Sequence, residues 1–338
     1  MRYNPALDGL RAVAITGVMI YHSFHPSFAG GWLGVDVFFT LSGFLITSIL
    51  LREIERTGSI NWGNFYWRRF LRLSPALAIL MIFELFHAAL SPRGAREILE
   101  AMAISVPYLE NFNTAYVSWP QDYLGHTWSL ATEEQFYLIW PLILPFVIQR
   151  RPIVSLVSAA TILFVGRFAL WHFGASANHL SFGPDTRPIG LLIGCGLAFV
   201  PKLPTMPKLA SWGFLGLIGA AFLAGSNGPD WFSITAPLVA SLSTAGIIIA
   251  AQQKNAPNIL SWNPVVYIGR ISYGLYLYSA PICLFGATKG INPFLLLILS
   301  FVAAAVSYEF VEKPALRLKD QRRSVEGMAQ VNCARIAS

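Results

Sequence analysis

Two ionisable residues, Arg11 and His22, lie within the first long apolar stretch of the sequence, LDGLRAVAITGVMIYHSF at residues 7–24. They are eleven residues apart, and at about 100° per residue this spacing returns an α-helix to within roughly 20° of the same face. The two side chains would be separated by about 16 Å along the helix axis. Because ionisable groups in apolar helices face the bundle interior and mark a pathway or a site, the aligned pair predicts a functional stripe. The alternative is that Arg11 extends to the headgroups and that His22 makes an ordinary interhelical hydrogen bond.

A carboxylate occurs at a matching depth in the next apolar stretch, GGWLGVDVFFTLSGFLI. Asp36 falls about one turn inside this predicted helix, and His22 falls about one turn inside the same membrane surface. Since an Asp beside a His fixes the imidazole tautomer and raises its basicity, we predict that Asp36 pairs with His22 as a catalytic base. Alternatively, Asp36 caps its own helix, where the helix dipole favours a carboxylate. Deeper in the stretch, Ser42 and Gly43 are small residues that would permit close helix packing.

Three arginines occur together in the segment FYWRRFLRLSP, at positions 68, 69 and 72. Arg68 and Arg72 are four residues apart and would share a helix face with Arg69 beside them, which makes a forked cationic site suited to phosphate. Taken alone, the general excess of basic residues on the cytoplasmic side of membrane proteins is the simpler explanation.

A second polar segment, GHTWSLATEEQFYLIWP, is dense in functional groups for a stretch that enters a membrane. His126, Ser129 and Glu133 have the spacing i, i+3, i+7 and would line one helical face, whereas Glu134 would point elsewhere. A capping box formed by Thr132 and the glutamine three residues later is the alternative. It would leave His126, Trp128 and Ser129 without a role.

The composition predicts that membrane helices position these residues. The chain has 338 residues, 55% of them hydrophobic and only 12% charged, and its mean hydropathy is +0.54. A helix needs about 20 mostly apolar residues to cross about 30 Å of hydrocarbon. Ten runs of about this length are residues 9–26, 33–51, 71–90, 128–148, 153–173, 187–201, 209–225, 231–251, 270–288 and 293–311. An eleventh, residues 98–109, suits an interfacial or re-entrant helix better.

The distribution of Lys and Arg predicts the orientation of the bundle. With ten spans and the N-terminus inside, the cytoplasmic side receives seventeen basic residues and the outer side only Arg93, Arg96 and Lys289. Such an excess is typical of cytoplasmic loops. A basic face beside anionic lipid accounts for the net charge of +7, so no nucleic acid partner is expected. We therefore expect an all-α integral membrane protein, a bundle of about ten transmembrane helices with both termini cytoplasmic.

The sequence divides into a transmembrane domain over residues 1–314 and a basic cytoplasmic tail over residues 315–338, which we expect to be partly disordered. The arginine inside the first apolar run and the nine runs after it favour a retained helix over a cleaved signal peptide. The three cysteines, Cys195, Cys283 and Cys333, lack metal-ligand spacing, so no metal site is expected.

Together these motifs resemble acyltransferase family 3, the bacterial integral-membrane acyltransferases that modify surface polysaccharides, lipopolysaccharide O-antigen, peptidoglycan, Nod factors and some small molecules. The resemblance covers nearly the whole chain. Its motifs are LDGLRAVA with ten residues between Arg11 and His22, GVDVFFTLSGFLI, WRRFLRLSP, HTWSLATEEQFYL, DTR at 185–187, IGRISYGLYLYSAPI and SYEFVEKP.

The resemblance implies a multi-pass protein of the bacterial cytoplasmic (inner) membrane, with no tightly bound cofactor and with acyl-CoA, usually acetyl-CoA, as donor substrate. The acceptor would be a hydroxyl of a carbohydrate or glycolipid at the outer side. Arg11, Arg68, Arg69 and Arg72 would hold the CoA phosphates. His22, oriented by Asp36, would deprotonate the acceptor or briefly carry the acyl group. The acceptor site would be shaped by His126, Trp128, Ser129, Glu133, Glu134 and Arg187.

The chain departs from the family at Ser279, in the segment LYLYSAP, where members often have a His. We also expect no hydrolase-like domain of the kind that some members carry, and therefore expect the bundle to complete transfer alone or with a separate partner. A proton-coupled transporter is the rival interpretation of the intramembrane His, Asp and Arg, although we find no internal repeat. A non-catalytic scaffold is a third. The acceptor stays open among O-antigen, exopolysaccharide, oligosaccharide and small natural products, as do acyl chain length and oligomeric state.

Overall fold

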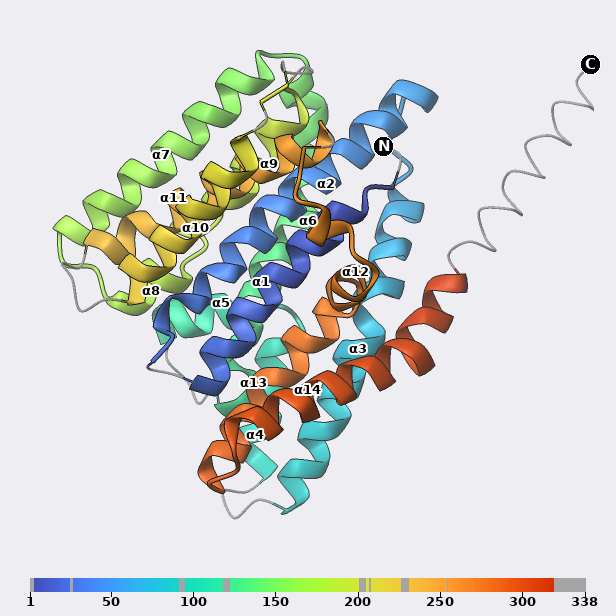
Figure 1. Ribbon diagram of the computed structural model, residues 1–338, viewed down its shortest axis with the longest axis vertical. Helices are drawn as coiled ribbons and strands as arrows, with labels where there is room; N and C mark the ends of the chain where they lie inside the picture. Colours follow the sequence, from blue (N-terminus) through green and yellow to red (C-terminus); the bar gives the residue numbers. More distant parts are fainter. Residues whose placement is uncertain are drawn as a thin grey trace, which may run out of the picture.

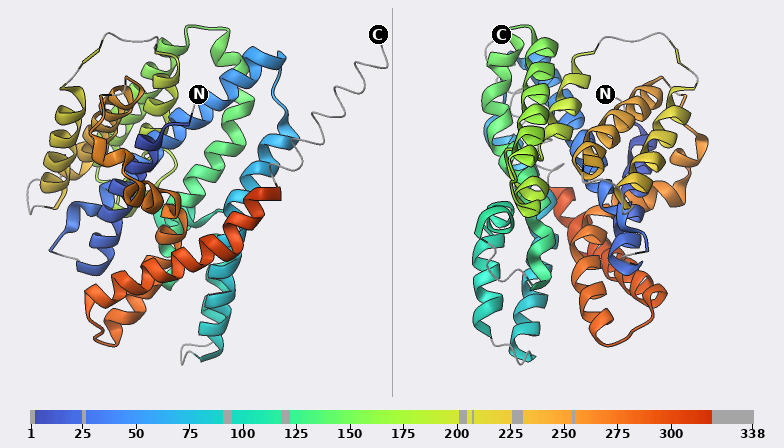
Figure 2. Two further views of the ribbon diagram at one scale, coloured as in Figure 1. Left: turned by 45° about the vertical axis from the view of Figure 1, so that its right-hand side comes forward. Right: turned by 90° about the vertical axis from the view of Figure 1, so that its left-hand side faces the viewer.

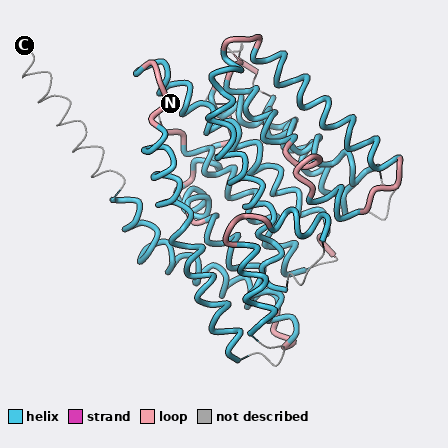
Figure 3. Tube along the Cα trace, turned by 180° about the vertical axis from the view of Figure 1, so that it is seen from behind, coloured by secondary structure: helices cyan, strands magenta, loops and turns pink. Residues whose placement is uncertain are grey.

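The computed structural model describes residues 3–24, 27–90, 95–117, 122–200, 205–206, 208–225, 231–253 and 255–318, and within these ranges every regular element is a helix (Figures 1 and 3). This confirms the expected all-α class. Residues 315–318 of the predicted tail continue the last helix. The remaining tail residues, 319–338 with Cys333, lie outside the described residues, as do Arg93, Lys202 and Lys254.

The longer helices form the body of the molecule. They are α1 (Pro5–Phe24), α2 (Gly34–Thr57), α3 (Trp62–Leu90), α6 (Trp128–Ile148), α7 (Pro152–His172), α10 (Leu209–Gly225), α11 (Trp231–Gln252), α13 (Ser272–Thr288) and α14 (Pro293–Ser307). Shorter helices connect them: α4 (Ala95–Ser105), α5 (Glu110–Phe112), α8 (Ala177–Phe182), α9 (Ile189–Ala198) and α12 (Asn263–Arg270). Single turns of 3-10 or π-helix are η1 (Ala29–Leu33), η2 (Asn113–Val117), η3 (Asp122–Thr127), η4 (Asn258–Ser261) and η5 (Tyr308–Glu312).

Each of the ten predicted apolar runs overlaps one of these helices, and the eleventh run corresponds largely to α4. Five helical stretches of the described chain are long and apolar enough to cross a membrane: Ala29–Thr57, Trp62–Ala89, Pro152–His172, Ile234–Gln252 and Pro293–Leu318. Ile189–Ala198 and Leu209–Gly225 are apolar but shorter. The chain is thus a multi-pass helical membrane protein, while the count of ten spans and the cytoplasmic side of the termini stay predictions.

Helix α1 lies in the middle of the bundle and contacts α2, α12 and α13 (Figure 1). Figures 1 and 2 show α7 and α9–α11 at one end of the molecule and α3, α4, α13 and α14 at the other, with α1, α2 and α6 between them. The spacing of Leu7, Leu10, Ala14 and Val18, which are all buried, places one apolar stripe of α1 against its neighbours. Arg11 and His22 are only partly buried and face cavities between helices.

Glycines bring α2 and α9 into close contact. A Cβ at Gly43 would lie 2.1 Å from the backbone oxygen of Leu191, and a Cβ at Gly194 would lie 2.1 Å from that of Thr40. Because no side chain larger than hydrogen fits at either position, the two backbones can touch, as small residues allow between membrane helices. The packing role predicted for Gly43 is therefore confirmed.

Candidate functional site

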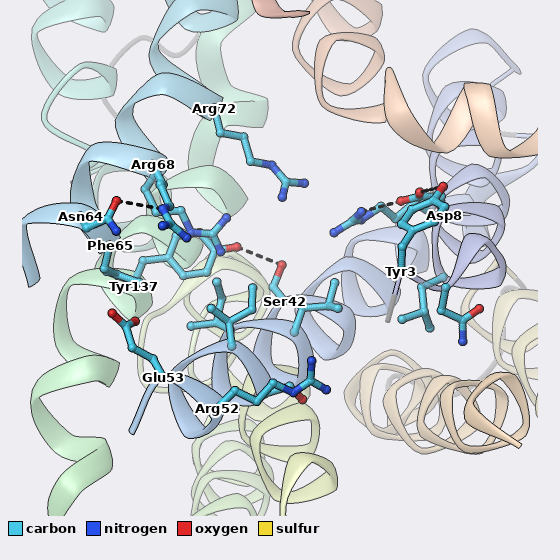
Figure 4. A pocket seen from close by; sticks show the side chains of 18 residues that line it. Tyr3, Asp8, Ser42, Arg52, Glu53, Asn64, Phe65, Arg68, Arg72 and Tyr137 are labelled. Carbon is cyan, nitrogen blue, oxygen red and sulfur yellow. Dashed lines mark hydrogen bonds and ion pairs between the residues drawn. The ribbon is translucent and has the colours of Figure 1, made fainter. Parts of the chain in front are cut away.

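A pocket of about 380 Å³, here called the basic pocket, lies between α1, α2 and the first half of α3 (Figure 4). Its lining holds five arginines, Arg11, Arg52, Arg68, Arg69 and Arg72, against two carboxylates, Asp8 and Glu53. The structure thus brings together the three arginines of the segment FYWRRFLRLSP with Arg11, which the family resemblance adds to the expected phosphate site. Helix α3 begins at Trp62, before the predicted apolar run at residues 71–90, and therefore includes the arginine segment. As a result the helix itself positions these side chains.

Most of these arginines are held in place by neighbouring side chains. Arg11 Nη1 lies 2.8 Å from Asp8 Oδ1, and Arg68 Nε donates to Asn64 Oδ1 at 2.9 Å. The guanidinium carbon of Arg69 lies 3.9 Å from the ring centroid of Tyr137. Figure 4 shows Arg72 extending into the cavity from the side opposite Asp8. Arg72 is exposed there and has no hydrogen bond or ion pair with the described residues, so its five donors are available to an anion.

A narrower cavity of about 70 Å³, here called the passage, continues from the basic pocket. The two cavities share five lining residues: Arg11, Ser42, Arg69, Arg72 and Tyr137. Half-buried Glu133 also lines the passage, where it interacts electrostatically with the arginines. Ser42 Oγ donates to Glu133 Oε1 at 2.7 Å, and the Tyr137 hydroxyl donates to Ser42 Oγ at 3.0 Å.

A third cavity of about 230 Å³, here called the outer pocket, contains His22. It shares Val35 and Tyr276 with the passage, so the three cavities form a series from the arginines of α3 to the histidine of α1. His126, Trp128 and Arg187 also line the outer pocket. The structure therefore brings three of the predicted acceptor residues together with His22.

The predicted pairing of Asp36 with His22 is wrong in this structure. Asp36 is fully buried and forms a two-point ion pair with Arg187: Nη1 lies 3.2 Å from Oδ1, and Nη2 donates to Oδ2 at 3.2 Å. Among the described residues no hydrogen bond joins Asp36 to His22. The physical reason is that Arg187, only 1% exposed, is a permanent buried cation that needs a carboxylate more than a neutral imidazole does.

Two tryptophans hold the guanidinium of Arg187 at the wall of the outer pocket. Its Cζ lies 5.1 Å from the ring centroid of Trp32 and 5.2 Å from that of Trp128. A planar guanidinium between aromatic faces and a carboxylate is fixed in orientation. Trp32 has no counterpart among the residues predicted from the sequence. An aromatic residue four positions before an intramembrane Asp is the signal that could have indicated it.

His22 contacts Ser279, the residue at which the sequence departs from the pattern of the family that it resembles. Its Nδ1 lies 3.1 Å from Oγ of Ser279, a fully buried residue of α13. Because Nδ1 is engaged with Ser279, Nε2 is the nitrogen left for exchange in the outer pocket. The contact joins residues 257 positions apart, and only the unusual serine in LYLYSAP marked it in the sequence.

His126 and Ser129 support Tyr276, which stands between the passage and the outer pocket. Ser129 Oγ and the Tyr276 hydroxyl are 2.5 Å apart, and that hydroxyl donates to the backbone oxygen of His126. Nε2 of His126 donates to the carbonyl oxygen of Leu277 at 3.1 Å, since a carbonyl can only accept. Ser129 lines the passage and not the outer pocket, so the structure does not place it beside His22 with the other predicted acceptor residues.

The predicted shared face of His126, Ser129 and Glu133 does not form either. Helix α6 begins at Trp128, and His126 lies in the preceding 3-10 turn, so the regular 100° rotation does not extend to it. Glu133 consequently lines the passage with the arginines and not the outer pocket. Glu134 lies outside the linings of the basic pocket, the passage and the outer pocket. The alternative capping box also fails, because Thr132 lies inside the helix and donates to the Trp128 carbonyl at 3.1 Å.

The described residues contain no group of three or more His, Cys, Asp or Glu side chains that could hold a metal ion. The site's donors are instead arginines, imidazoles and hydroxyls. This set suits binding of a phosphorylated organic molecule in the basic pocket and proton exchange at His22.

The chain is similar in sequence to known acyltransferases. The family model described as "Acyltransferase domain" matches residues 4–308. "O-acetyltransferase OatA" of Staphylococcus aureus (strain NCTC 8325 / PS 47) is 34% identical over 347 residues, covering 93% of this chain and 57% of that protein. "Putative peptidoglycan O-acetyltransferase YrhL" of Bacillus subtilis (strain 168) is 33% identical over 349 residues, covering 93% of this chain and 55% of the relative. The chain thus spans little more than half the length of these relatives. No solved structure matches it.

Proposed function

The chain belongs to the acyltransferase domain family, and from this premise we propose that it is a membrane O-acetyltransferase that moves an acetyl group from cytoplasmic acetyl-CoA to a hydroxyl of a glycan at the outer side of the bacterial cytoplasmic membrane. One observation carries the proposal most directly. The series of basic pocket, passage and outer pocket links a cluster of arginines to His22.

The basic pocket fits the phosphorylated end of the donor. Arg11, Arg68 and Arg69 are already held by neighbours, and Arg72 extends into the cavity, so little ordering is needed when phosphates bind. The slender pantetheine arm would occupy the passage beside Ser42 and Tyr276. Arg11 and His22 are separated by about 16 Å along α1, and this length would be covered by the arm.

His22 would supply the proton transfer. For Nε2 to act as a base, the Nδ1 hydrogen must be donated to Ser279 Oγ, which leaves a lone pair on Nε2. The acceptor hydroxyl gives its proton to Nε2 while its oxygen attacks the thioester carbonyl. The carbon–sulfur bond then breaks, and the departing CoA thiolate takes the proton from the imidazolium. In the alternative route Nε2 attacks the thioester carbonyl, and the carbon–sulfur bond breaks to release the CoA thiolate. The acceptor hydroxyl then attacks the acetyl group on Nε2, the carbon–nitrogen bond breaks, and the hydroxyl proton passes to the thiolate.

The outer pocket would hold the acceptor sugar. Trp32 and Trp128 offer flat aromatic faces, and the fixed guanidinium of Arg187 offers donors to a hydroxyl or to the developing oxyanion. Because one relative is named for peptidoglycan, peptidoglycan fragments are the first acceptors to test, ahead of O-antigen and exopolysaccharide.

The test is CoA release from acetyl-CoA by the purified protein in detergent with peptidoglycan fragments as acceptor. His22→Ala is expected to reduce release at least about 100-fold, the lower end of what a positioned base supplies. Arg11→Ala is expected to weaken acetyl-CoA binding. The matched controls are His172→Ala and Arg96→Ala, since both side chains are exposed and line none of the three cavities.

The two proposed roles fail separately. Full transfer by a well-folded His22→Ala variant would refute the role of His22. A wild-type protein that binds no acetyl-CoA would refute the role of the basic pocket and favour a transporter.

A further inference from the structure

Outside the three cavities, Tyr116, His179 and Asp185 form a cluster that no step of the proposed reaction uses. His179 Nε2 donates to the Asp185 carboxylate, at 2.8 Å from Oδ2 and 3.1 Å from Oδ1. The Tyr116 hydroxyl donates to Asp185 Oδ1 at 3.0 Å. The rings of Tyr116 and His179 lie 4.8 Å apart between centroids. We call this group the rim cluster.

The fold constructs the rim cluster from two separate segments. Tyr116 lies on η2, whereas His179 lies on α8 and Asp185 in the turn that follows it. Thr186 Oγ1 fixes that turn by donating to the His179 carbonyl at 3.1 Å and to the Gly183 carbonyl at 3.0 Å. A Cβ at Gly183 would lie 2.7 Å from the backbone oxygen of His179, so a residue larger than glycine does not fit in this turn.

The same segment forms one wall of the outer pocket. Ser181 and Phe182, at the end of α8, line that pocket, and the Phe182 ring packs against Trp128 with centroids 5.0 Å apart. Arg187 follows Asp185 by two residues and points into the pocket. The rim cluster therefore borders the pocket in which the acceptor sugar would react.

The exposure of the rim cluster distinguishes it from a buried structural network. Tyr116 is 50% exposed, and the side chain of Asp185 is 48% exposed. Partial burial and the hydrogen bond to Asp185 raise the pKa of Tyr116 to about 12, so the phenol stays a donor. The carboxylate has lone pairs beyond those that His179 and Tyr116 use. An open aromatic face beside a carboxylate with spare acceptors matches a sugar ring, which has an apolar face and hydroxyl donors at its edge.

We infer that the rim cluster binds a sugar ring of the glycan acceptor next to the one that receives the acetyl group. The Tyr116 ring stacks on that sugar, and Asp185 accepts hydrogen bonds from its hydroxyls. This inference rests on the proposed function, because it takes the acceptor to be a glycan. It makes the protein selective for acceptors longer than the reacting unit.

The test measures glycan binding without acetyl-CoA, by calorimetry on the full chain in detergent. The probes are a disaccharide and a tetrasaccharide of the peptidoglycan repeat, N-acetylglucosamine linked to N-acetylmuramic acid. Tyr116→Ala and Asp185→Ala are each expected to raise the Kd for the tetrasaccharide about tenfold. Tyr116→Phe keeps the ring and should retain most of the binding. Phe173→Ala is the matched control, since Phe173 is an 84% exposed aromatic residue between α7 and α8.

Binding of the disaccharide should be the same in wild type and in all four variants. If the variants lose disaccharide and tetrasaccharide binding equally and have a lower Tm, the rim cluster only stabilises the contact between η2 and α8. That result would overturn the inference. Failure of the wild type to bind the tetrasaccharide would also overturn it. Binding is independent of CoA release, so intact length-dependent binding in a protein that transfers no acetyl group would refute the proposed function while supporting the subsite.

Discussion

Replacing Asp36 by Ala should destabilise the protein more than replacing its partner Arg187 by Leu. Removing one member of a buried ion pair costs about 3–5 kcal/mol, because the other charge stays buried without compensation. Asp36 interacts electrostatically with two buried arginines, Arg187 and Arg167. Its loss therefore affects two cations, whereas loss of Arg187 leaves Asp36 with the charge of Arg167.

The expected magnitudes follow from this asymmetry. Asp36→Ala should lie near about 5 kcal/mol and Arg187→Leu near about 3 kcal/mol, the two ends of the measured range for buried pairs. At roughly 2 °C per kcal/mol for a chain of this size, the decreases in Tm would be about 10 °C and about 6 °C. The double variant should lose less than the sum of the two single variants, because no unpaired member of the pair remains.

The assay is thermal unfolding of the detergent-solubilised variants, followed by intrinsic fluorescence and by loss of the monodisperse peak in size-exclusion chromatography. Glu100→Ala is the matched control, because that carboxylate is 43% exposed in its pair with Arg96 and should contribute little. A decrease for Arg187→Leu equal to or larger than that for Asp36→Ala would refute the argument that Asp36 neutralises both arginines.

Three further predictions concern the donor site, the base and the packing. Arg72→Ala should raise the Kd for acetyl-CoA about 10- to 100-fold through loss of charge-assisted hydrogen bonds to phosphate, measured by calorimetry, and an unchanged Kd would contradict its role. Ser279→Ala removes the partner of His22, the proposed base, and should lower kcat about 2- to 10-fold with acetyl-CoA affinity unchanged. A change in affinity alone would argue against a positioning role. Gly43→Ala should lower the unfolding free energy by about 1–3 kcal/mol, because the added Cβ meets the α9 backbone. Gly166→Ala is the control, since Gly166 has open space around it and its replacement should leave the unfolding free energy unchanged. Equal Tm values for the two variants would show that α2 and α9 separate freely.

The sequence predicted the helices well because apolar run length is a local property. The runs 128–148 and 209–225 have the same bounds as α6 and α10. The run at 187–201 was overestimated: α9 is ten residues long, about 15 Å, which is about half the hydrocarbon thickness. The grouping of Arg68, Arg69 and Arg72 was predicted for the same reason, since the three residues share one helix.

Contacts between helices were predicted less well, because depth in a membrane does not fix which neighbour a side chain faces. Asp36 and His22 have similar predicted depths, but glycine packing joins α2 to α9, and Asp36 consequently meets Arg187 near the start of that helix. His22 meets Ser279 because α1 packs against α13. The predicted shared face of His126 and Glu133 fails for a local reason, because the 3-10 turn changes to an α-helix at Trp128.

The charge of the passage between the basic pocket and the outer pocket also affects how well the cell maintains its membrane potential. A water-filled path through a membrane protein conducts protons and small cations, and such a leak would discharge the membrane potential. The passage is small, about 70 Å³, and Arg11, Arg69 and Arg72 line it. Fixed positive charges in a narrow pore repel cations. The same arginines that would attract an anionic donor would therefore also keep cations out of the passage. Acetyl groups would then leave the cytoplasm without an accompanying flow of protons.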